Sequence, residues 1–268
     1  MGLNPYLFLV NQKMKINLNS LILNPNLVWA VLTGFVFSGF YSCTNETESG
    51  SPEAGLWYPV QEGSTWIYGV DSIWIDCVAG RNDTFRFQVR EIMDGWVKGA
   101  SGDSLMKIIR QVRTDSTQNW GVPRIWHTRM EPGKAIKTEE NRSIIKLVFP
   151  MKLGLKWNGW GYLPEPAAQD FEYVEVNAPY AGYDSTALIV QWANENLLEK
   201  QFFCERYARN TGLIYAYRCE VTGIVTNPND PNDCSSLLPP DQPWSVIPLL
   251  GRVKFGYQYE QRLLEYIP

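Results

Sequence analysis

The stretch Trp66-Ile-Tyr-Gly-Val-Asp-Ser-Ile-Trp-Ile75 alternates between two sides of an extended chain, and this alternation decides the fold class. Side chains in a β-strand point to opposite faces with a period of two, so the run predicts a strand with one wet face. Similar short runs, bounded by Gly, Asn, Asp and Pro, occur at residues 84–90, 104–113, 143–149, 171–176, 186–192 and 254–260. The sequence therefore predicts a mainly β protein with antiparallel strands.

Two segments of the chain share the same sequence pattern. Tyr58-Pro-Val-Gln-Glu-Gly-Ser-Thr-Trp66 and Phe149-Pro-Met-Lys-Leu-Gly-Leu-Lys-Trp157 share an aromatic-Pro-apolar start, a Gly and a Trp, each at an offset of 91 residues. This period is too long for a solenoid. It predicts two related halves, 56–148 and 149–268, each opening with a turn that feeds a strand; chance similarity is the alternative. A curved sheet, an open or closed barrel and a sandwich remain open as architectures.

Residues 1–42 have the composition of a signal peptide. They carry two lysines, Lys13 and Lys15, no acidic residue, and an apolar run over residues 27–40. A run of about 14 residues is shorter than the ~20 that a membrane-spanning helix needs, so we expect cleavage before Cys43. An uncleaved N-terminal anchor is the alternative, and both interpretations place the remaining chain outside the cytoplasm. Because a second apolar patch precedes the lysines, we predict that translation starts at Met14.

Cys43 is the predicted site of lipid attachment. The residues after it are polar and acidic, which is typical of chain that cannot pack a core, so residues 43–55 are predicted to form a flexible tether. The membrane would then be reached through the lipid and not through a helix of the protein.

Several motifs resemble those of uncharacterised Bacteroidota lipoproteins. The Phe40-Tyr-Ser-Cys43 sequence resembles the looser lipoboxes of that group, and the acidic Glu46 and Glu48 resemble its surface-export signal. The aromatic-Pro-Gly-Trp segments at 58–68 and 149–157 and the Tyr-Ala-Arg-Asn-Thr-Gly-Leu-Ile-Tyr turn at 207–215 are also similar. The resemblance implies an outer-membrane lipoprotein of the cell envelope, on the periplasmic or the surface face. It carries no catalytic residues.

The charge of the chain excludes one class of partner. Without the two leader lysines, 22 of the 24 basic residues remain against 28 acidic ones, a net charge of −6. No basic cluster occurs along the sequence. Nucleic acid is therefore not an expected partner.

Four cysteines remain after Cys43. An even number in an oxidising compartment predicts up to two disulfides, with three possible connectivities. We favour Cys219–Cys234, because the turn-forming residues between them can fold the chain back, and then Cys77–Cys204. No Cys-x-x-Cys spacing occurs, so no metal site is expected.

Catalytic signatures are sparse. The single histidine, His127, would have to serve any Ser-His-Asp triad, and no Gly-x-Ser-x-Gly motif is present. We assign His127 a structural or surface role and predict no catalytic residue and no cofactor. Carboxylate chemistry of the glycosidase type needs no histidine and stays open.

The ten tryptophans of the mature chain provide the remaining functional signal. Aromatic rings stack on sugars or line apolar pockets. Trp66, Trp74 and Trp192 lie in alternating strands and are predicted core residues. The tryptophans beside Gly, Asn or Pro are predicted to face a ligand: Trp120, Trp157, Trp160 and Trp244.

The leading functional hypothesis is a non-enzymatic, lipid-anchored envelope protein that binds a glycan, an apolar molecule or an envelope protein. The alternative is a carboxylate-based glycan hydrolase, which a pocket with two close carboxylates among exposed tryptophans would favour. A purely structural assembly protein is a third hypothesis, which a broad exposed apolar patch would favour.

Overall fold

The computed structural model describes residues 52–162, 170–196, 198–223 and 253–268. The chain divides into two units, Met1–Thr47 and Glu48–Pro268, and every described residue lies in the second. The predicted signal peptide, the start at Met14, Cys43, Cys234 and Trp244 all lie outside the described residues. None of the described helical segments has the length and apolar character that crossing a bilayer requires.

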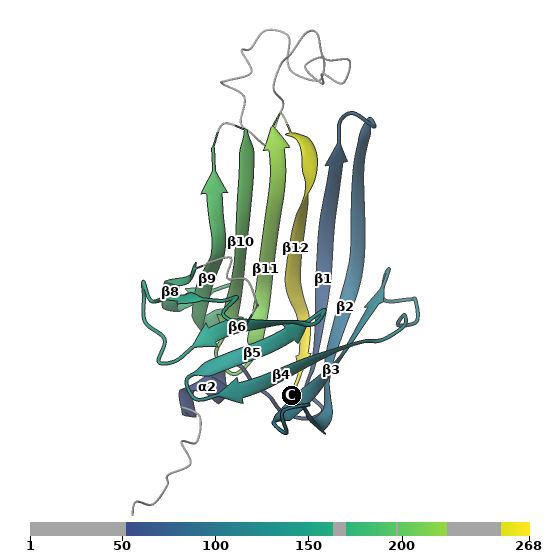
Figure 1. Cartoon of the computed structure of the whole chain (residues 1–268). Helices are drawn as coiled ribbons and strands as arrows, with labels where there is room; N and C mark the ends of the chain where they lie inside the picture. The colour runs from purple at the N-terminus through teal and green to yellow at the C-terminus, as the bar shows by residue number, and fades with distance from the viewer. Residues whose placement is uncertain (1–51, 163–169, 197, 224–252) are drawn as a thin grey trace, which may run out of the picture. The chain divides into compact units, whose positions relative to one another are not determined.

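One short helix and twelve strands make up the described chain (Figure 1). They are α2 (Pro52–Trp57), β1 (Thr65–Asp76), β2 (Arg81–Lys98), β3 (Ser104–Arg113), β4 (Arg124–Glu131), β5 (Lys134–Glu139), β6 (Arg142–Val148), β7 (Lys156–Asn158), β8 (Asp170–Tyr180), β9 (Tyr183–Glu195), β10 (Glu199–Ala208), β11 (Gly212–Gly223) and β12 (Val253–Ile267).

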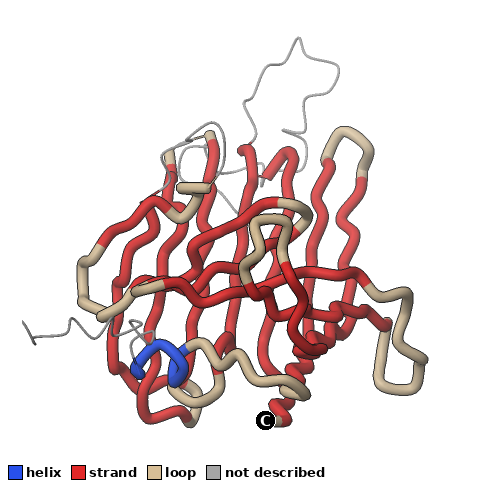
Figure 2. Tube along the Cα trace, turned by 60° about the horizontal axis from the view of Figure 1, so that its bottom comes forward, coloured by secondary structure: helices blue, strands red, loops and turns tan. Residues whose placement is uncertain are grey.

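All twelve strands belong to one antiparallel sheet, which confirms the predicted fold class. Their order is β6-β5-β4-β3-β2-β1-β12-β11-β10-β9-β8-β7. Each strand therefore pairs with its neighbours in sequence, except that β6 and β7 lie at the two ends of the sheet and β1 pairs with β12. The long strands β1, β2 and β9–β12 run side by side, and β3–β6 cross in front of their lower part (Figures 1 and 2). Of the architectures left open, the structure forms a nearly closed, barrel-like sheet.

The two ends of the sheet meet without forming a ladder. The N–H of Ile145 in β6 donates to the carbonyl oxygen of Gly159, just after β7, at 2.8 Å. Trp157 Nε1 donates to the carbonyl oxygen of Ile145 at 2.9 Å, and the Tyr173 hydroxyl donates to the carbonyl of Val148 at 2.9 Å. These few bonds join β6 to β7, to Gly159 and to Tyr173 of β8, whereas β1 and β12 are paired along twelve residues of β1.

The repeated segments adopt the same local structure. The turns at 61–64 and 152–155 each close through one backbone hydrogen bond, of 3.2 and 3.0 Å, and hold their glycines at φ 92° and 76°. The N–H of Gly63 donates to Met93 and that of Gly154 to Tyr173, both at 2.8 Å. Strands β1–β6 lie within 56–148 and β7–β12 within 149–268, so each predicted half contains one six-stranded meander.

The helix α2 shortens the predicted tether. Ala54 and Trp57 are almost fully buried, and the carbonyl of Leu56 accepts a hydrogen bond from the N–H of Asn210 at 2.6 Å. Residues 52–55 were expected in the tether but belong to the folded body, because the two apolar side chains of this helix complete the core. A polar composition alone does not mark where the tether ends.

The predicted cysteine pairings do not form. Cys204 and Cys219 are both free and buried, and Cys77 is disulfide-bonded but not to either of these two. β1, which ends beside Cys77, is separated from β10 by two strands in the sheet. At about 4.8 Å per strand this exceeds the ~7 Å between Cα atoms that a disulfide can bridge. The pairings Cys77–Cys204 and Cys219–Cys234 are therefore wrong.

Candidate functional site

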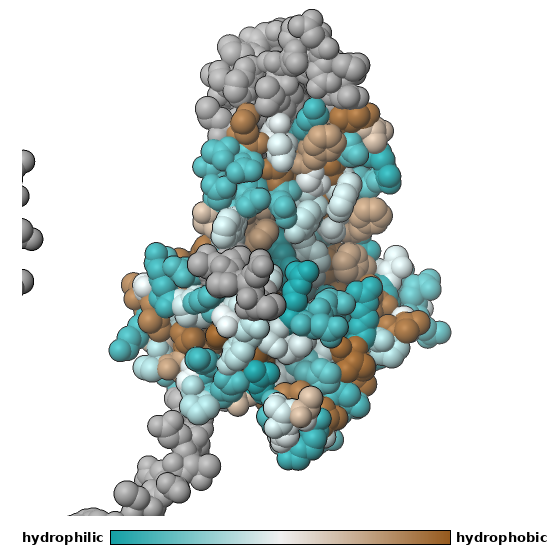
Figure 3. Space-filling view, in the orientation of Figure 1, coloured by the Kyte–Doolittle hydropathy of each residue, from teal (hydrophilic) through white to brown (hydrophobic). Residues whose placement is uncertain are grey.

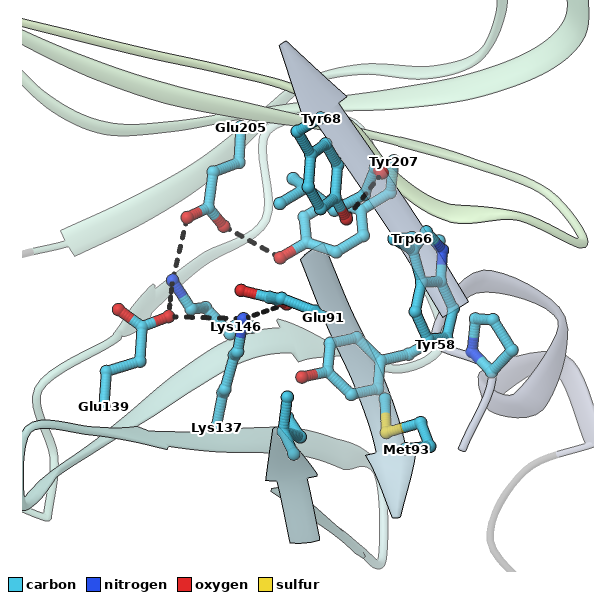
Figure 4. Close-up of a pocket in the computed structure, with 14 residues that line it drawn as sticks. Tyr58, Trp66, Tyr68, Glu91, Met93, Lys137, Glu139, Lys146, Glu205 and Tyr207 are labelled. Atoms are coloured by element: carbon cyan, nitrogen blue, oxygen red, sulfur yellow. Dashed lines mark hydrogen bonds and ion pairs between the residues drawn. The ribbon is translucent and has the colours of Figure 1, made fainter. Parts of the chain in front are cut away.

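A chain of alternating charges lies inside the sheet, where the sequence pattern predicts apolar side chains. It contains Arg110, Glu91, Lys137, Glu139, Lys146 and Glu205, which we call the ion-pair chain. Figure 4 shows its members from Glu91 to Glu205. Successive partners are 2.6, 2.8, 3.8, 3.2 and 2.8 Å apart, and the hydroxyl of Tyr207 donates to the far oxygen of Glu205 at 2.8 Å. The ion-pair chain thus connects five strands, from β3 and β2 through β5 and β6 to β10.

The sheet geometry places each of these charges. Glu91 and Arg110 are direct cross-strand partners on β2 and β3, so their side chains point to the same face. Lys146 has no partner on β5, because Ala135 pairs with Leu147 and Ile136 with Ile145. Such a β-bulge re-aims a side chain, and here it turns the ammonium group of Lys146 inward to Glu205.

The three carboxylates of the chain are ionised. Burial disfavours the charged form of Glu139, but Lys146 and Lys137 outweigh it and lower its pKa to about 2. Burial also opposes ionisation of Glu91 and Glu205, yet Lys137 and Arg110 lower the pKa of the first and Lys146 that of the second. A glycosidase needs one carboxyl that stays protonated to donate a proton. Glu91, Glu139 and Glu205 lack that property, so these three carboxylates do not favour the hydrolase alternative.

Two cavities are lined in part by the ion-pair chain. The smaller, about 50 Å³, lies among aromatic core residues that include Tyr58, Trp66 and Tyr68 (Figure 4). The larger, about 310 Å³, is lined by Glu91, Arg110, Trp126, Lys137, Glu139, Glu140, Glu205, Leu213, Ala216, Arg218, Tyr257, Tyr259 and Gln261. Glu140 is exposed, so the larger cavity reaches the surface there. We refer to it as the charged cavity.

The rings in this cavity interact with its cations. Arg110 and Lys137 lie over the Trp126 ring, 4.5 and 4.8 Å from its centre. Tyr259 donates to Gln261 at 2.6 Å. Tyr257 stacks on Trp74, with ring centres 6.3 Å apart and planes at 16°. Aromatic groups and fixed charges thus line one space.

Three of the four tryptophans predicted to face a ligand lie among the described residues, and none of these three lines the charged cavity. Trp157 packs on Phe171 and Tyr173 at the meeting of β6 and β7, and Trp160 packs against the same core cluster. Trp120 lies beneath two guanidinium groups of β2 and β3, at 4.5 and 4.1 Å. Loop position does not imply exposure, because loops that cover a β core need aromatic groups to fill it.

Trp74 is the opposite case. It was predicted to be a core residue, yet its exposed fraction is 54%, while Trp66 is buried and Trp192 is half-buried. Trp74 lies near the end of β1, beyond the part of the sheet that β3–β6 cross, so nothing in the described chain buries it fully. The alternation along β1 predicts correctly on which side of the strand Trp74 lies, but it does not predict how much of the side chain other residues bury.

Other kinds of site are not formed by the described residues. No group of three or more His, Cys, Asp or Glu side chains there is arranged to hold a metal ion. On the face drawn in Figure 3, apolar and polar side chains of the described residues are interspersed, without one broad apolar patch. His127 lies half-buried in β4, opposite Thr138 of β5.

Comparison with known proteins gives few matches. No family model and no curated protein matches the chain. A crystal structure of a proposed exported protein with a YmcC-like fold from Bacteroides fragilis is similar at 11% identity and a TM-score of 0.40, covering 80% of this chain and 99% of the other. A proposed lipoprotein from Parabacteroides distasonis gives 8% identity and a TM-score of 0.39, with 78% and 97% covered. Neither likeness assigns the chain to a family.

Proposed function

We propose that this chain is a lipid-anchored protein of the bacterial outer membrane that binds a small polar ligand in the charged cavity and catalyses no reaction. The observation that carries the binding function is the cavity itself, about 310 Å³ of space lined by paired charges and aromatic rings. Small-molecule pockets start at roughly 300 Å³, so the space suits a ligand of monosaccharide size. An apolar ligand fits this lining poorly, because it would desolvate the charges without pairing them.

The anchor rests on the sequence. The basic start, the apolar run and the cysteine before a polar segment together support lipidation of Cys43. One acyl chain holds a protein to a membrane only weakly, whereas several chains hold it stably, so lipidation explains attachment without a spanning helix.

Lipidation of Cys43 is tested by metabolic labelling. Cells expressing the full chain and fed an alkyne fatty acid are expected to label the wild-type protein, and Cys43→Ala is expected to remove the label and release the protein from membranes. Cys219→Ala, which alters a buried cysteine of β11, serves as the matched control and should stay labelled. Continued labelling of Cys43→Ala would contradict the anchor.

Binding of the ligand in the charged cavity is tested by filling the cavity with a larger side chain. Ala216 lines the charged cavity, and Ala216→Trp is expected to reduce binding at least tenfold because the indole takes the ligand's place. The measurement is ligand-observed NMR with a panel of monosaccharides, sugar acids, sugar phosphates and amino acids. At least one panel member should bind the wild-type protein.

The control for this variant places the same side chain elsewhere. Ala193 is exposed on β9, so Ala193→Trp adds an indole away from the cavity and should leave binding unchanged. The binding function fails if no panel member binds the wild-type protein, or if Ala216→Trp, shown to be folded by circular dichroism, binds as the wild type does.

A further inference from the structure

The charges around the cavity do not balance. Three carboxylates of the ion-pair chain, Glu91, Glu139 and Glu205, face four cations: the three of the chain and Arg218 of β11. The remaining lining carboxylate, Glu140, lies at the exposed rim and pairs with Arg124 at 3.3 Å. Glu220, two residues from Arg218 on the same face, is exposed and interacts with the hydroxyl of Tyr257. Among the charges buried around the cavity, the cations thus outnumber the carboxylates by one.

Arg218 holds this surplus. Within the described part of the chain no carboxylate lies within 4 Å of its guanidinium, although its charge acts on Glu139 and Glu205 from farther away. A guanidinium presents a planar fork of donors that fits a carboxylate or phosphate through two parallel hydrogen bonds. The cavity therefore offers one free anion-binding group at a half-buried position.

Aromatic rings lie next to this group on the same face of the sheet. Arg218 is the direct partner of Tyr259 on β12, and Tyr257 lies two residues along on the same side. Tyr257 is in turn the direct partner of Trp74 on β1, and the two rings stack. The exposed Trp74 thus extends the cavity lining toward solvent. Such ring faces stack well on the apolar face of a sugar.

From this arrangement we infer that the ligand is an anionic monosaccharide, whose carboxylate or phosphate is bound by Arg218 while its ring lies against Tyr257 and Trp74. Gln261 and Tyr259 provide hydrogen-bonding groups for sugar hydroxyls in the same cavity. The inference rests on the proposed function and adds to it the charge and the ring of the ligand.

The test uses isothermal titration of the full, detergent-solubilised protein with glucuronate, glucose 6-phosphate, glucuronamide, glucose and acetate. At least one anionic sugar is expected to bind ten times more tightly than glucose or glucuronamide, and acetate alone should not bind. Comparison of glucuronate with its neutral amide isolates the charge without any mutation. The stronger of the two anionic sugars identifies whether carboxylate or phosphate is preferred.

Two variants test the separate roles of Arg218 and Trp74 in binding. Arg218→Gln is expected to reduce affinity for the anionic sugar to that for glucose, whereas Trp74→Ala should weaken the binding of charged and neutral sugars by a similar factor. Arg262→Gln removes an exposed arginine of β12 that pairs with Glu260, and it should leave binding unchanged.

Equal binding of glucose and glucuronate that Ala216→Trp abolishes would overturn the inference and leave the binding function intact. Unchanged anion binding by Arg218→Gln would overturn it as well. If no solute binds the wild-type protein, including every member of the panel used with Ala216→Trp, then both this inference and the proposed binding function are wrong.

Discussion

The variant Glu91→Gln is expected to lower the free energy of unfolding by about 3 kcal/mol. Glu91 accepts hydrogen bonds from Arg110 at 2.6 Å and from Lys137 at 2.8 Å, and all three side chains are largely buried. The amide keeps the shape but loses the charge, so two cations remain inside the sheet with only Glu139, 3.8 Å from Lys137, as a nearby carboxylate of the chain. Urea unfolding followed by circular dichroism measures the change.

The matched control is Glu140→Gln, which makes the same chemical change at the rim of the same cavity. Glu140 and Arg124 are both mostly exposed, with side-chain exposures of 63% and 74%, and exposed pairs contribute at most about 1 kcal/mol. If the two variants lose stability equally, the ion-pair chain does not hold β2 and β3 to β5, and the internal charges act only in binding.

A second large effect is expected for Gly256→Ala, at about 4 kcal/mol. A Cβ at this position would lie 2.1 Å from the carbonyl oxygen of Glu220 and 2.6 Å from Cα of Val221, both backbone atoms of β11. Backbone cannot move aside as a flexible side chain can, so β11 and β12 would have to separate where they pair. The φ of 138° adds strain of roughly 1–3 kcal/mol for any residue with a Cβ. Urea unfolding again provides the measurement.

Gly182→Ala separates strain from collision. Gly182 also has a positive φ, 89°, but a Cβ there meets no atom within 4 Å. Its replacement should cost only about 1 kcal/mol, the strain alone. If Gly256→Ala lowers the free energy of unfolding no more than Gly182→Ala does, then β11 and β12 can separate at Gly256 without a loss of stability.

Much of the fold follows from local sequence. The alternation in residues 66–75 identifies β1 because one face of that strand meets the core and the other does not. The shared Pro-Gly-Trp segments correspond to two turns with the same hydrogen bonds, since Gly63 and Gly154 both need a positive φ that other residues rarely adopt. These features depend on neighbours in sequence, so a single chain reveals them.

The site could not be predicted in the same way. The alternation rule assumes that charged side chains point to water, and Lys137 and Lys146 point inward. Lys146 does so because of a bulge, which depends on the pairing between β5 and β6. Its partner Glu205 is 59 positions away. The one available signal was weak: a lysine within the otherwise apolar run Ile144-Ile-Lys-Leu-Val148.

The pairing of β1 with β12 also sets the order in which the protein can be completed. Thr65 of β1 pairs with Ile267 of β12, so the first strand to be synthesised can pair fully only after the last described strand has been made. A chain synthesised from its N-terminus would carry one edge of β1 unpaired until β12 is made, and unpaired edges attract other strands. The two meanders can therefore join only as the last strand becomes available, and until then β1 is held by β2 alone.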